Sequence, residues 1–178
     1  MRRQLALGLL ALTFAVASVS PTRTATAADG QAAAGFSLLS LDNVNTSLSD
    51  FENQVVLLNF WATWCGPCQV EMPHLQRIYD AYKDQGFVLL SISSDDARSS
   101  SRVKPLVKSK GFTFPVLLDK QTKVTNMYNP SKTLPYSELL DHEHKSIWKH
   151  QGYTPGDEDE IEEHVKAAVE ARKAALGG

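Results

Sequence analysis

The sequence predicts an α/β domain whose central sheet is covered by helices. Two runs, Val55–Leu58 and Phe87–Ile92, lack the alternation of a half-exposed strand, which is typical of strands covered on both faces. Between them, apolar side chains recur at helical spacing from Met72 to Tyr82. A strand, a helix and a second buried strand in this order form the unit from which α/β sheets are built.

The composition fits one globular domain with an N-terminal extension. The chain has 178 residues, 43% of them hydrophobic, and a formal net charge of −2. A nucleic-acid partner is not expected, because proteins that bind phosphate backbones carry an excess of basic charge. We expect the protein to be a monomer.

The first residues have the pattern of a secretory signal, which we place at 1–27. Arg2 and Arg3 form a positive start, Leu5–Val19 is an apolar run, and Ala25–Ala27 is a small-x-small cleavage site. Export through the general secretory route is favoured over the twin-arginine route. The apolar run is short for a membrane span, although an uncleaved N-terminal anchor stays open as an alternative.

A hairpin is expected to open the folded domain. Residues 28–35 are small and polar and are predicted to be a flexible leader, so the domain itself is placed at 36–178. Two short strands, Phe36–Leu41 and Thr46–Leu48, flank an Asp42-Asn43 turn. Such a hairpin would cover one edge of the sheet.

The only two cysteines, Cys65 and Cys68, lie where the first buried strand passes into the helix. Cys65 is expected at the helix N-terminus, where unpaired backbone amides and the helix dipole favour a thiolate, so it is the predicted nucleophile. Cys68 lies about one turn further on the same face and can attack the sulfur of Cys65. Pro67 suits a first helical turn.

Two other interpretations of this pair are weaker. A zinc site lacks ligands, because the chain has no second cysteine pair and His74 is the nearest histidine by a wide margin. A purely structural disulfide would join distant segments, since so short a loop constrains the unfolded chain little. Reversible disulfide chemistry is the interpretation that the spacing and placement favour.

The remaining elements continue the α/β pattern. A polar loop over 93–101 leads to a helix with Val103, Leu106 and Val107 that ends near Gly111. The next predicted elements are, in order, a strand at Phe114–Leu118, a short helix at Lys123–Tyr128, and strands at Tyr136–Asp141 and Ser146–His150. His142, His144 and His150 lie close in sequence, but solvated turn residues are the favoured interpretation over a metal site.

Glu138 and the start of the last helix lie in the C-terminal part of the chain. Glu138 stands within a predicted strand, and a buried carboxylate there is costly unless it is paired or protonated. We therefore expect a loose or edge-exposed strand end, which is favoured over a catalytic acid at this position. The last helix is expected to start at Thr154 as the cap, with Pro155 in the first turn and Asp157 as the third-position carboxylate. Its buried stripe is predicted to be Ile161, Val165, Ala168 and Val169.

The segment Val55–Cys68, which reads VVLLNFWATWCGPC, resembles the thioredoxin superfamily. The continuation Cys68–Pro73, CQVEMP, narrows the resemblance to the TlpA/ResA-like thiol-disulfide oxidoreductases. The resemblance implies a thioredoxin fold, with a central mixed sheet flanked by helices, an N-terminal hairpin, and a central insertion formed by the helix and strand between 103 and 118. It implies no cofactor and no metal.

The resemblance also assigns roles to residues. Pro135 matches a proline that takes the cis form and lies against the two cysteines, so that the backbone of Leu134 can pair with an extended substrate. Trp64, Gly66 and Pro67 would border the same substrate site. Glu71 would exchange a proton with Cys68, in place of the buried aspartate that cytoplasmic thioredoxins have at the position of Asn59. A solvated glutamate at position 71 stays open as an alternative.

These assignments predict an enzyme that reduces protein disulfides outside the cytoplasm, with apocytochrome c thiols among its substrates by resemblance. A Cys-Gly-Pro-Cys dithiol with no third cysteine requires an external electron donor, which we expect to be membrane-borne. The alternatives are a copper-binding metallochaperone of thioredoxin fold and a disulfide-forming oxidant. A peroxidase of this fold is disfavoured, because that family needs a threonine where Ala62 stands.

Overall fold

A computed structural model describes residues 30–177, and the predicted signal at 1–27 lies outside this range. The strands form one seven-stranded sheet: β1 (Ser37–Ser40), β2 (Asn45–Ser47), β3 (Val55–Trp61), β4 (Phe87–Ser93), β5 (Val116–Leu118), β6 (Tyr136–Leu140) and β7 (Ser146–Gln151). The helices are α1 (Gly66–Tyr82), α2 (Val103–Lys110), α3 (Lys123–Tyr128) and α4 (Asp157–Leu176). None of the helices within 30–177 is long and apolar enough to cross a membrane.

The sheet is mixed, as predicted. Its strand order is β2-β1-β5-β4-β3-β6-β7, with β3, β4 and β5 parallel and the other neighbours antiparallel. The N-terminal hairpin is confirmed, and β1 pairs with β5 at one edge. The predicted insertion supplies α2 and β5, and β5 lies between the hairpin and β4. Because β3 is an interior strand between β4 and β6, the loop that follows it leaves from within the sheet and not from its edge.

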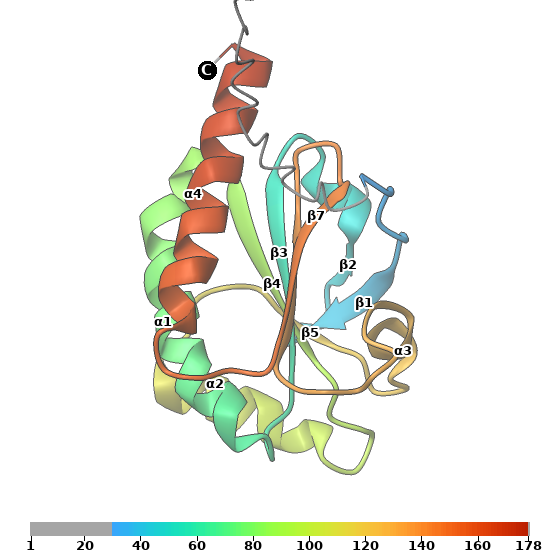
Figure 1. The fold of residues 1–178 in the computed structure, drawn as a ribbon. Coiled ribbons are helices and arrows are strands. Elements are labelled where there is room, and N and C mark those ends of the chain that lie inside the picture. The colour runs from blue at the N-terminus through green and yellow to red at the C-terminus, as the bar shows by residue number, and fades with distance from the viewer. Residues whose placement is uncertain (1–29, 178) are drawn as a thin grey trace, which may run out of the picture.

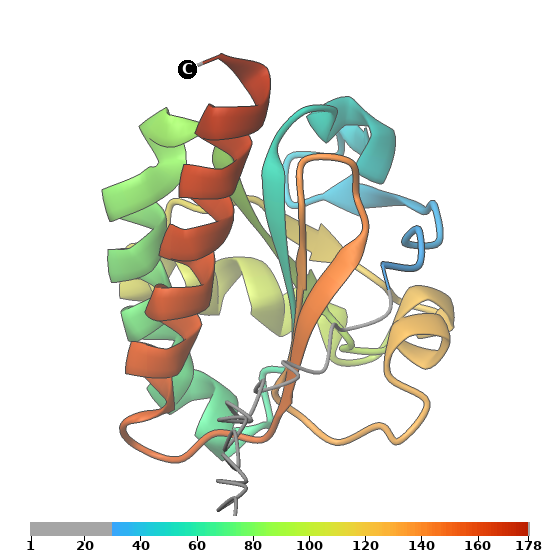
Figure 2. The same ribbon diagram turned by 45° about the horizontal axis from the view of Figure 1, so that its top comes forward.

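Helices cover both faces of the sheet, and each face has its own apolar core. Figure 1 shows α1 and α4 side by side on one face and α3 on the other, and Figure 2 shows the same layers from a second direction. Alternate residues of β3 point to opposite faces: Leu57 packs with α1 and α4, whereas Leu58 packs with α3. This explains the absence of alternation in the sequence, since both faces of the strand are buried.

Part of the predicted flexible leader is paired with the sheet. The Ala33 N–H donates to the His144 carbonyl at 2.8 Å, and the Ser146 N–H donates to the Gln31 carbonyl at 3.1 Å. The Tyr128 hydroxyl donates to the Ala34 carbonyl. These contacts make residues 31–34 part of the folded domain. The sequence did not predict this, because backbone hydrogen bonding does not depend on side-chain type.

The last helix begins later than predicted. Thr154 is not its cap: α4 starts at Asp157, and Gly156 precedes it with a φ of 110°. A helix cannot run through a residue with positive φ, so Thr154 and Pro155 form a turn before the helix instead. The buried stripe of Ile161, Val165, Ala168 and Val169 is confirmed.

The predicted loose strand end at Glu138 is wrong. Glu138 lies in β6, which is hydrogen-bonded to β3 on one side and β7 on the other, and it is 4% exposed. Its carboxylate accepts a hydrogen bond from the Tyr136 hydroxyl at 2.8 Å and lies 3.5 Å from Lys149 Nζ. The carboxylate is tolerated in a central strand because both oxygens have a partner.

We expect Tyr136→Phe to lower the free energy of unfolding by about 1–3 kcal/mol, because it removes the donor to a buried carboxylate. Denaturant unfolding at neutral pH measures this loss. Tyr153→Phe is the matched control, since Tyr153 donates to Glu158, whose side chain is more exposed than that of Glu138. Equal losses in the two variants would contradict a special role for the Tyr136–Glu138 bond.

The three histidines predicted to be solvated have different environments. His142 and His144 are half-buried, and His144 Nε2 lies 3.0 Å from the Phe51 carbonyl. His150 lies in β7 and contacts Asp157. Across residues 30–177, no three histidine, cysteine or acidic side chains are grouped closely enough to hold a metal ion.

Candidate active site

The two cysteines lie where β3 ends and α1 begins, as predicted, and they are joined in a disulfide. Cys65 is the N-cap of α1, and its Sγ accepts a hydrogen bond from the Cys68 N–H at 3.3 Å. An amide donor and the positive end of the helix dipole both favour negative charge on this sulfur. Pro67 stands in the first turn of the helix, where no amide donor is required.

A buried aspartate, Asp95, holds the loop that presents Cys65. It accepts hydrogen bonds from the Thr63 N–H at 2.8 Å and the Thr63 hydroxyl at 2.6 Å. The Gln69 side chain donates to the Thr63 carbonyl at 2.8 Å, which ties the loop to α1 as well. Sequence reasoning missed Asp95, which stands in the predicted polar loop after β4; its place just after a buried strand was the available signal.

The disulfide is exposed on one side only. Cys65 is 6% exposed and Cys68 is fully buried. Around Cys65 the chain presents an exposed surface, in which the Trp64 side chain is the largest apolar group and Gly66 and Pro67 are also open to solvent. A partner can therefore reach Cys65 while Cys68 stays covered. Val70, half-exposed on α1, adds apolar surface that the sequence prediction did not include.

The Leu134–Pro135 peptide bond is cis. The antiparallel register pairs Phe60 with Tyr136, so Pro135 comes opposite Trp61, at the end of β3 from which the Cys65 loop leaves. Pro135 is buried, Leu134 is half-buried, and the Pro135 carbonyl accepts a hydrogen bond from the Gly152 N–H at 2.8 Å. The role of Leu134 in pairing with substrate stays a prediction.

Glu71 is buried, so the solvated alternative is wrong. The residue is 1% exposed and lies on the buried face of α1, three residues after Cys68. Its Oε2 accepts a hydrogen bond from Asn59 Nδ2 at 2.9 Å. Burial raises the pKa of Glu71 from 4.5 to about 8; the Asn59 bond opposes this shift and the charge of Asp157 adds to it. The carboxyl group is therefore protonated at neutral pH when the disulfide is closed.

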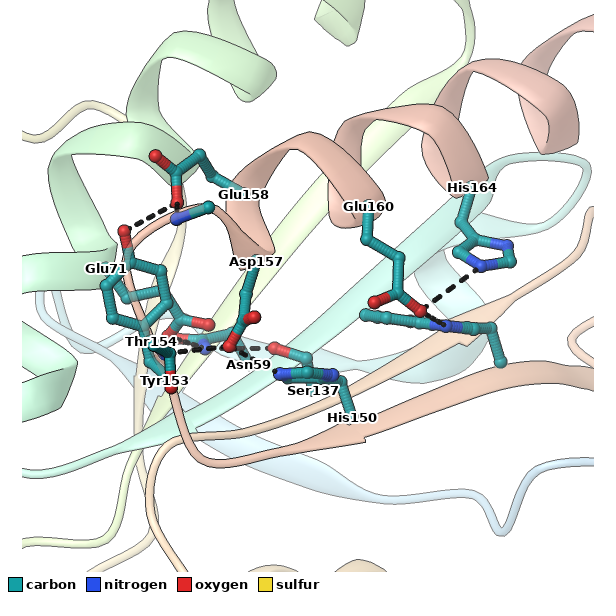
Figure 3. A network of polar contacts seen from close by, with 12 residues as sticks. Asn59, Glu71, Ser137, His150, Tyr153, Thr154, Asp157, Glu158, Glu160 and His164 are labelled. Carbon is teal, nitrogen blue, oxygen red and sulfur yellow. Dashed lines mark hydrogen bonds and ion pairs between the residues drawn. The ribbon is translucent and has the colours of Figure 1, made fainter.

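Asn59 joins Glu71 to a row of polar residues that crosses the sheet from β3 to β7. This polar row consists of Asn59, Ser137 and His150. Asn59 Nδ2 also donates to the Ser137 hydroxyl at 3.2 Å, and Ser137 pairs with His150 in the register of β6 and β7. His150 Nε2 lies 3.1 Å from Asp157 Oδ2. Figure 3 shows these side chains together beneath the start of α4. Sequence reasoning did not connect Ser137, His150 or Asp157 with the site, because they come from three separate elements.

A disulfide that is exposed on one side at a helix N-terminus, with a buried carboxyl group three residues after its inner cysteine, defines a thioredoxin-like thiol-disulfide oxidoreductase. Comparison with known proteins agrees with this class. The family described as "AhpC/TSA family" matches residues 30–148. The chain belongs to this family, and its relatives include ResA-like thiol-disulfide oxidoreductases.

Three similar proteins illustrate the relationship. Thiol-disulfide oxidoreductase ResA of Bacillus cereus is 36% identical over 120 residues, which cover 67% of this chain and 68% of that protein. The thioredoxin domain of a thiol-disulfide oxidoreductase from Bacteroides vulgatus has a TM-score of 0.63 and 26% identity, covering 76% of this chain and 96% of that one. The exposed lipoprotein thioredoxin Etrx1 of Streptococcus pneumoniae has a TM-score of 0.64 and 28% identity, covering 75% and 99%.

Proposed function

We propose that this protein reduces protein disulfides outside the cytoplasm through the Cys65–Cys68 dithiol. The observation that carries the proposal is the difference between the two sulfurs. Cys65 is reachable and accepts an amide hydrogen bond at the helix N-terminus, whereas Cys68 is covered and close in sequence to a buried carboxyl group. The first is suited to attack a substrate, and the second is suited to release it.

Reduction of a substrate proceeds in two exchanges. The Cys65 thiolate attacks a substrate disulfide, so that a bond forms between Cys65 and one substrate sulfur while the other sulfur leaves as a thiolate. Cys68 then gives its proton to the Glu71 carboxylate and attacks the Cys65 sulfur, which releases the second substrate thiolate. The protein ends as the disulfide with Glu71 protonated, in agreement with the raised pKa of Glu71 in the disulfide form.

Recycling runs the same steps in reverse. A thiolate of the electron donor attacks Cys65, and Cys68 leaves as a thiolate that takes the proton from Glu71. A second donor thiolate then displaces Cys65. We propose a membrane-borne dithiol donor, because the sequence has no third cysteine through which the chain could relay electrons internally.

The location and the substrate surface are part of the proposal. The secretory pattern at 1–27 and the similarity to an exposed lipoprotein thioredoxin support action outside the cytoplasm. Trp64, Gly66 and Pro67 offer an open surface next to Cys65, and the Leu134 backbone would pair with an extended substrate segment. Apocytochrome c thiols are the substrate that the resemblance suggests.

The direction of electron flow is tested by the reduction potential of the Cys65–Cys68 couple, measured against glutathione or dithiothreitol on the protein without its signal. We expect a value near or below the roughly −270 mV of thioredoxin, because the Gly-Pro spacer has no histidine to stabilise the thiolate further. A value near roughly −120 mV would make the protein a disulfide-forming oxidant. Tight copper(I) binding without insulin reduction would instead make it a metallochaperone.

A further inference from the structure

We propose that Asp157 is a positioning residue for the proton transfer between Glu71 and Cys68, and that its negative charge keeps the Glu71 proton in place while the disulfide is closed. The inference rests on the proposed role of Glu71 and adds a residue that reaches the site from the far end of the chain. Asp157 contacts neither sulfur in the structure. It acts through Glu71.

Asp157 is fixed in place by two contacts. It is the first residue of α4, and its Oδ2 accepts a hydrogen bond from the Thr154 N–H at 2.7 Å. The same oxygen lies 3.1 Å from His150 Nε2. Both side chains are mostly covered, with 28% of Asp157 and 20% of His150 exposed. These two contacts keep the Asp157 carboxylate at the start of α4, on the side that faces the Asn59–Glu71 pair (Figure 3).

Figure 3 shows Asp157 and His150 reaching the Asn59–Glu71 pair from α4 and β7. The polar cluster there is incompletely bonded: within the described residues, Glu71 Oε1 and Asn59 Oδ1 are buried without a hydrogen-bond partner. A protonated Glu71 has a hydroxyl group to donate, whereas an ionised one would leave a charge with a single donor. The cluster therefore favours the protonated, neutral form of Glu71 over its carboxylate.

Glu158, the next residue of α4, is a second carboxylate close to Glu71 in Figure 3. Glu158 accepts from the Tyr153 hydroxyl at 2.7 Å and from the Gly156 N–H at 2.8 Å, and it lies 3.5 Å from His74 Nδ1. These contacts hold the Glu158 carboxylate, just as the Thr154 amide and the His150 imidazole hold that of Asp157. Asp157 is the charged group that adds to the raised pKa of Glu71, after burial itself. A nearby negative charge disfavours a second one in a medium of low dielectric.

The consequence concerns recycling of the disulfide. When a donor thiolate opens the bond, Cys68 needs a proton at once, and a protonated Glu71 supplies it without access to solvent. Without the Asp157 charge, Glu71 should lose its proton at a lower pH. A fall of one unit in its pKa reduces the ratio of protonated to ionised Glu71 tenfold at any pH.

The test is a pH titration of the Glu71 side-chain carboxyl carbon by NMR in the ¹³C-glutamate-labelled, oxidised protein. Asp157→Asn keeps an oxygen for the Thr154 N–H and removes the charge, and we expect the Glu71 midpoint to fall by about half a unit or more. Asp157→Glu, which restores the charge, should move the midpoint back towards that of the unmodified protein. An unchanged midpoint in Asp157→Asn would overturn the proposal.

Glu160→Gln is the matched control. It removes the same charge from the same turn of α4, but Glu160 faces Trp148 and His164, away from Glu71 (Figure 3). An equal shift in this variant would mean that the general charge of the helix start is responsible, and would also overturn the proposal.

A second measurement separates this proposal from the proposed function. The pH profile of reduction of the disulfide by dithiothreitol should move with the Glu71 midpoint in Asp157→Asn. If the midpoint shifts and the rate profile does not, Asp157 controls a carboxyl group that takes no part in the exchange, which overturns the role of Glu71. If neither shifts while Glu71→Gln slows the reaction, the role of Glu71 stands and that of Asp157 fails.

Discussion

Cys65→Ser should abolish disulfide reductase activity, whereas Cys68→Ser should stop the reaction after its first step. The reason lies in the difference between the two sulfurs: Cys65 is the one that a substrate can reach, and Cys68 is buried behind it. Without Cys65 no bond to the substrate forms. Without Cys68 the bond forms but nothing displaces it, so the protein accumulates as a mixed disulfide.

Insulin reduction and mass spectrometry under non-reducing conditions measure the two outcomes. The Cys65→Ser rate should equal that of dithiothreitol alone, and Cys68→Ser should gain the mass of the substrate chain. The double variant is the control, because it should show neither activity nor adduct. An adduct on Cys65→Ser, and none on Cys68→Ser, would reverse the assignment of nucleophile and resolving cysteine.

Glu71→Gln should remove a marked pH dependence from the stability of the oxidised protein. The pKa of Glu71 is raised by burial from 4.5 to about 8, so the folded protein binds this proton more tightly than the unfolded chain does. Its stabilising contribution is therefore fully present below pH 4.5 and is lost as the pH rises through about 8. Between these values the free energy of unfolding should fall by up to about 1.4 kcal/mol per pH unit from this group alone.

Denaturant unfolding at several pH values between 5 and 8.5 checks this result on the disulfide form. Relative to the unmodified protein, Glu71→Gln should become more stable with increasing pH, since an amide has the shape of the carboxyl group and does not ionise. Glu163→Gln, at an exposed position of α4, is the control for loss of one negative charge. Parallel curves for the unmodified protein and Glu71→Gln would show that the Glu71 carboxyl titrates normally.

The burial of Glu71 also bears on how the site is built. Its hydrogen-bond partner Asn59 is 12 positions away in the chain, and Ser137, which shares that partner, is 78 positions from Asn59. Nothing in the local sequence distinguishes a glutamate on this face of α1 from a solvated one. Glu71 is buried because α1 and α4 pack together over the sheet and cover the polar row (Figure 1).

Several features differ from the sequence prediction because they depend on contacts between separate elements. Glu138 is paired with Tyr136 and Lys149, and His150 with Asp157. Residues 31–34 are anchored at the start of β7 and on α3. These contacts have no signal in the local sequence pattern. The start of α4 is set by the positive φ of Gly156, whereas the capping pattern at Thr154 predicted an earlier start. Each of these depends on which atoms meet in space.

The sequence by itself determined the α/β class, the order of the strands and helices, the hairpin, and the placement of Cys65 at a helix N-terminus, because apolar periodicity and helix starts are properties of neighbouring residues. Only the tertiary structure decided that Glu71 is a buried neutral acid bonded to Asn59 and that Asp157 lies near it (Figure 3). The proton affinity of a carboxyl group depends on the water it loses and the charges it faces, and folding supplies both.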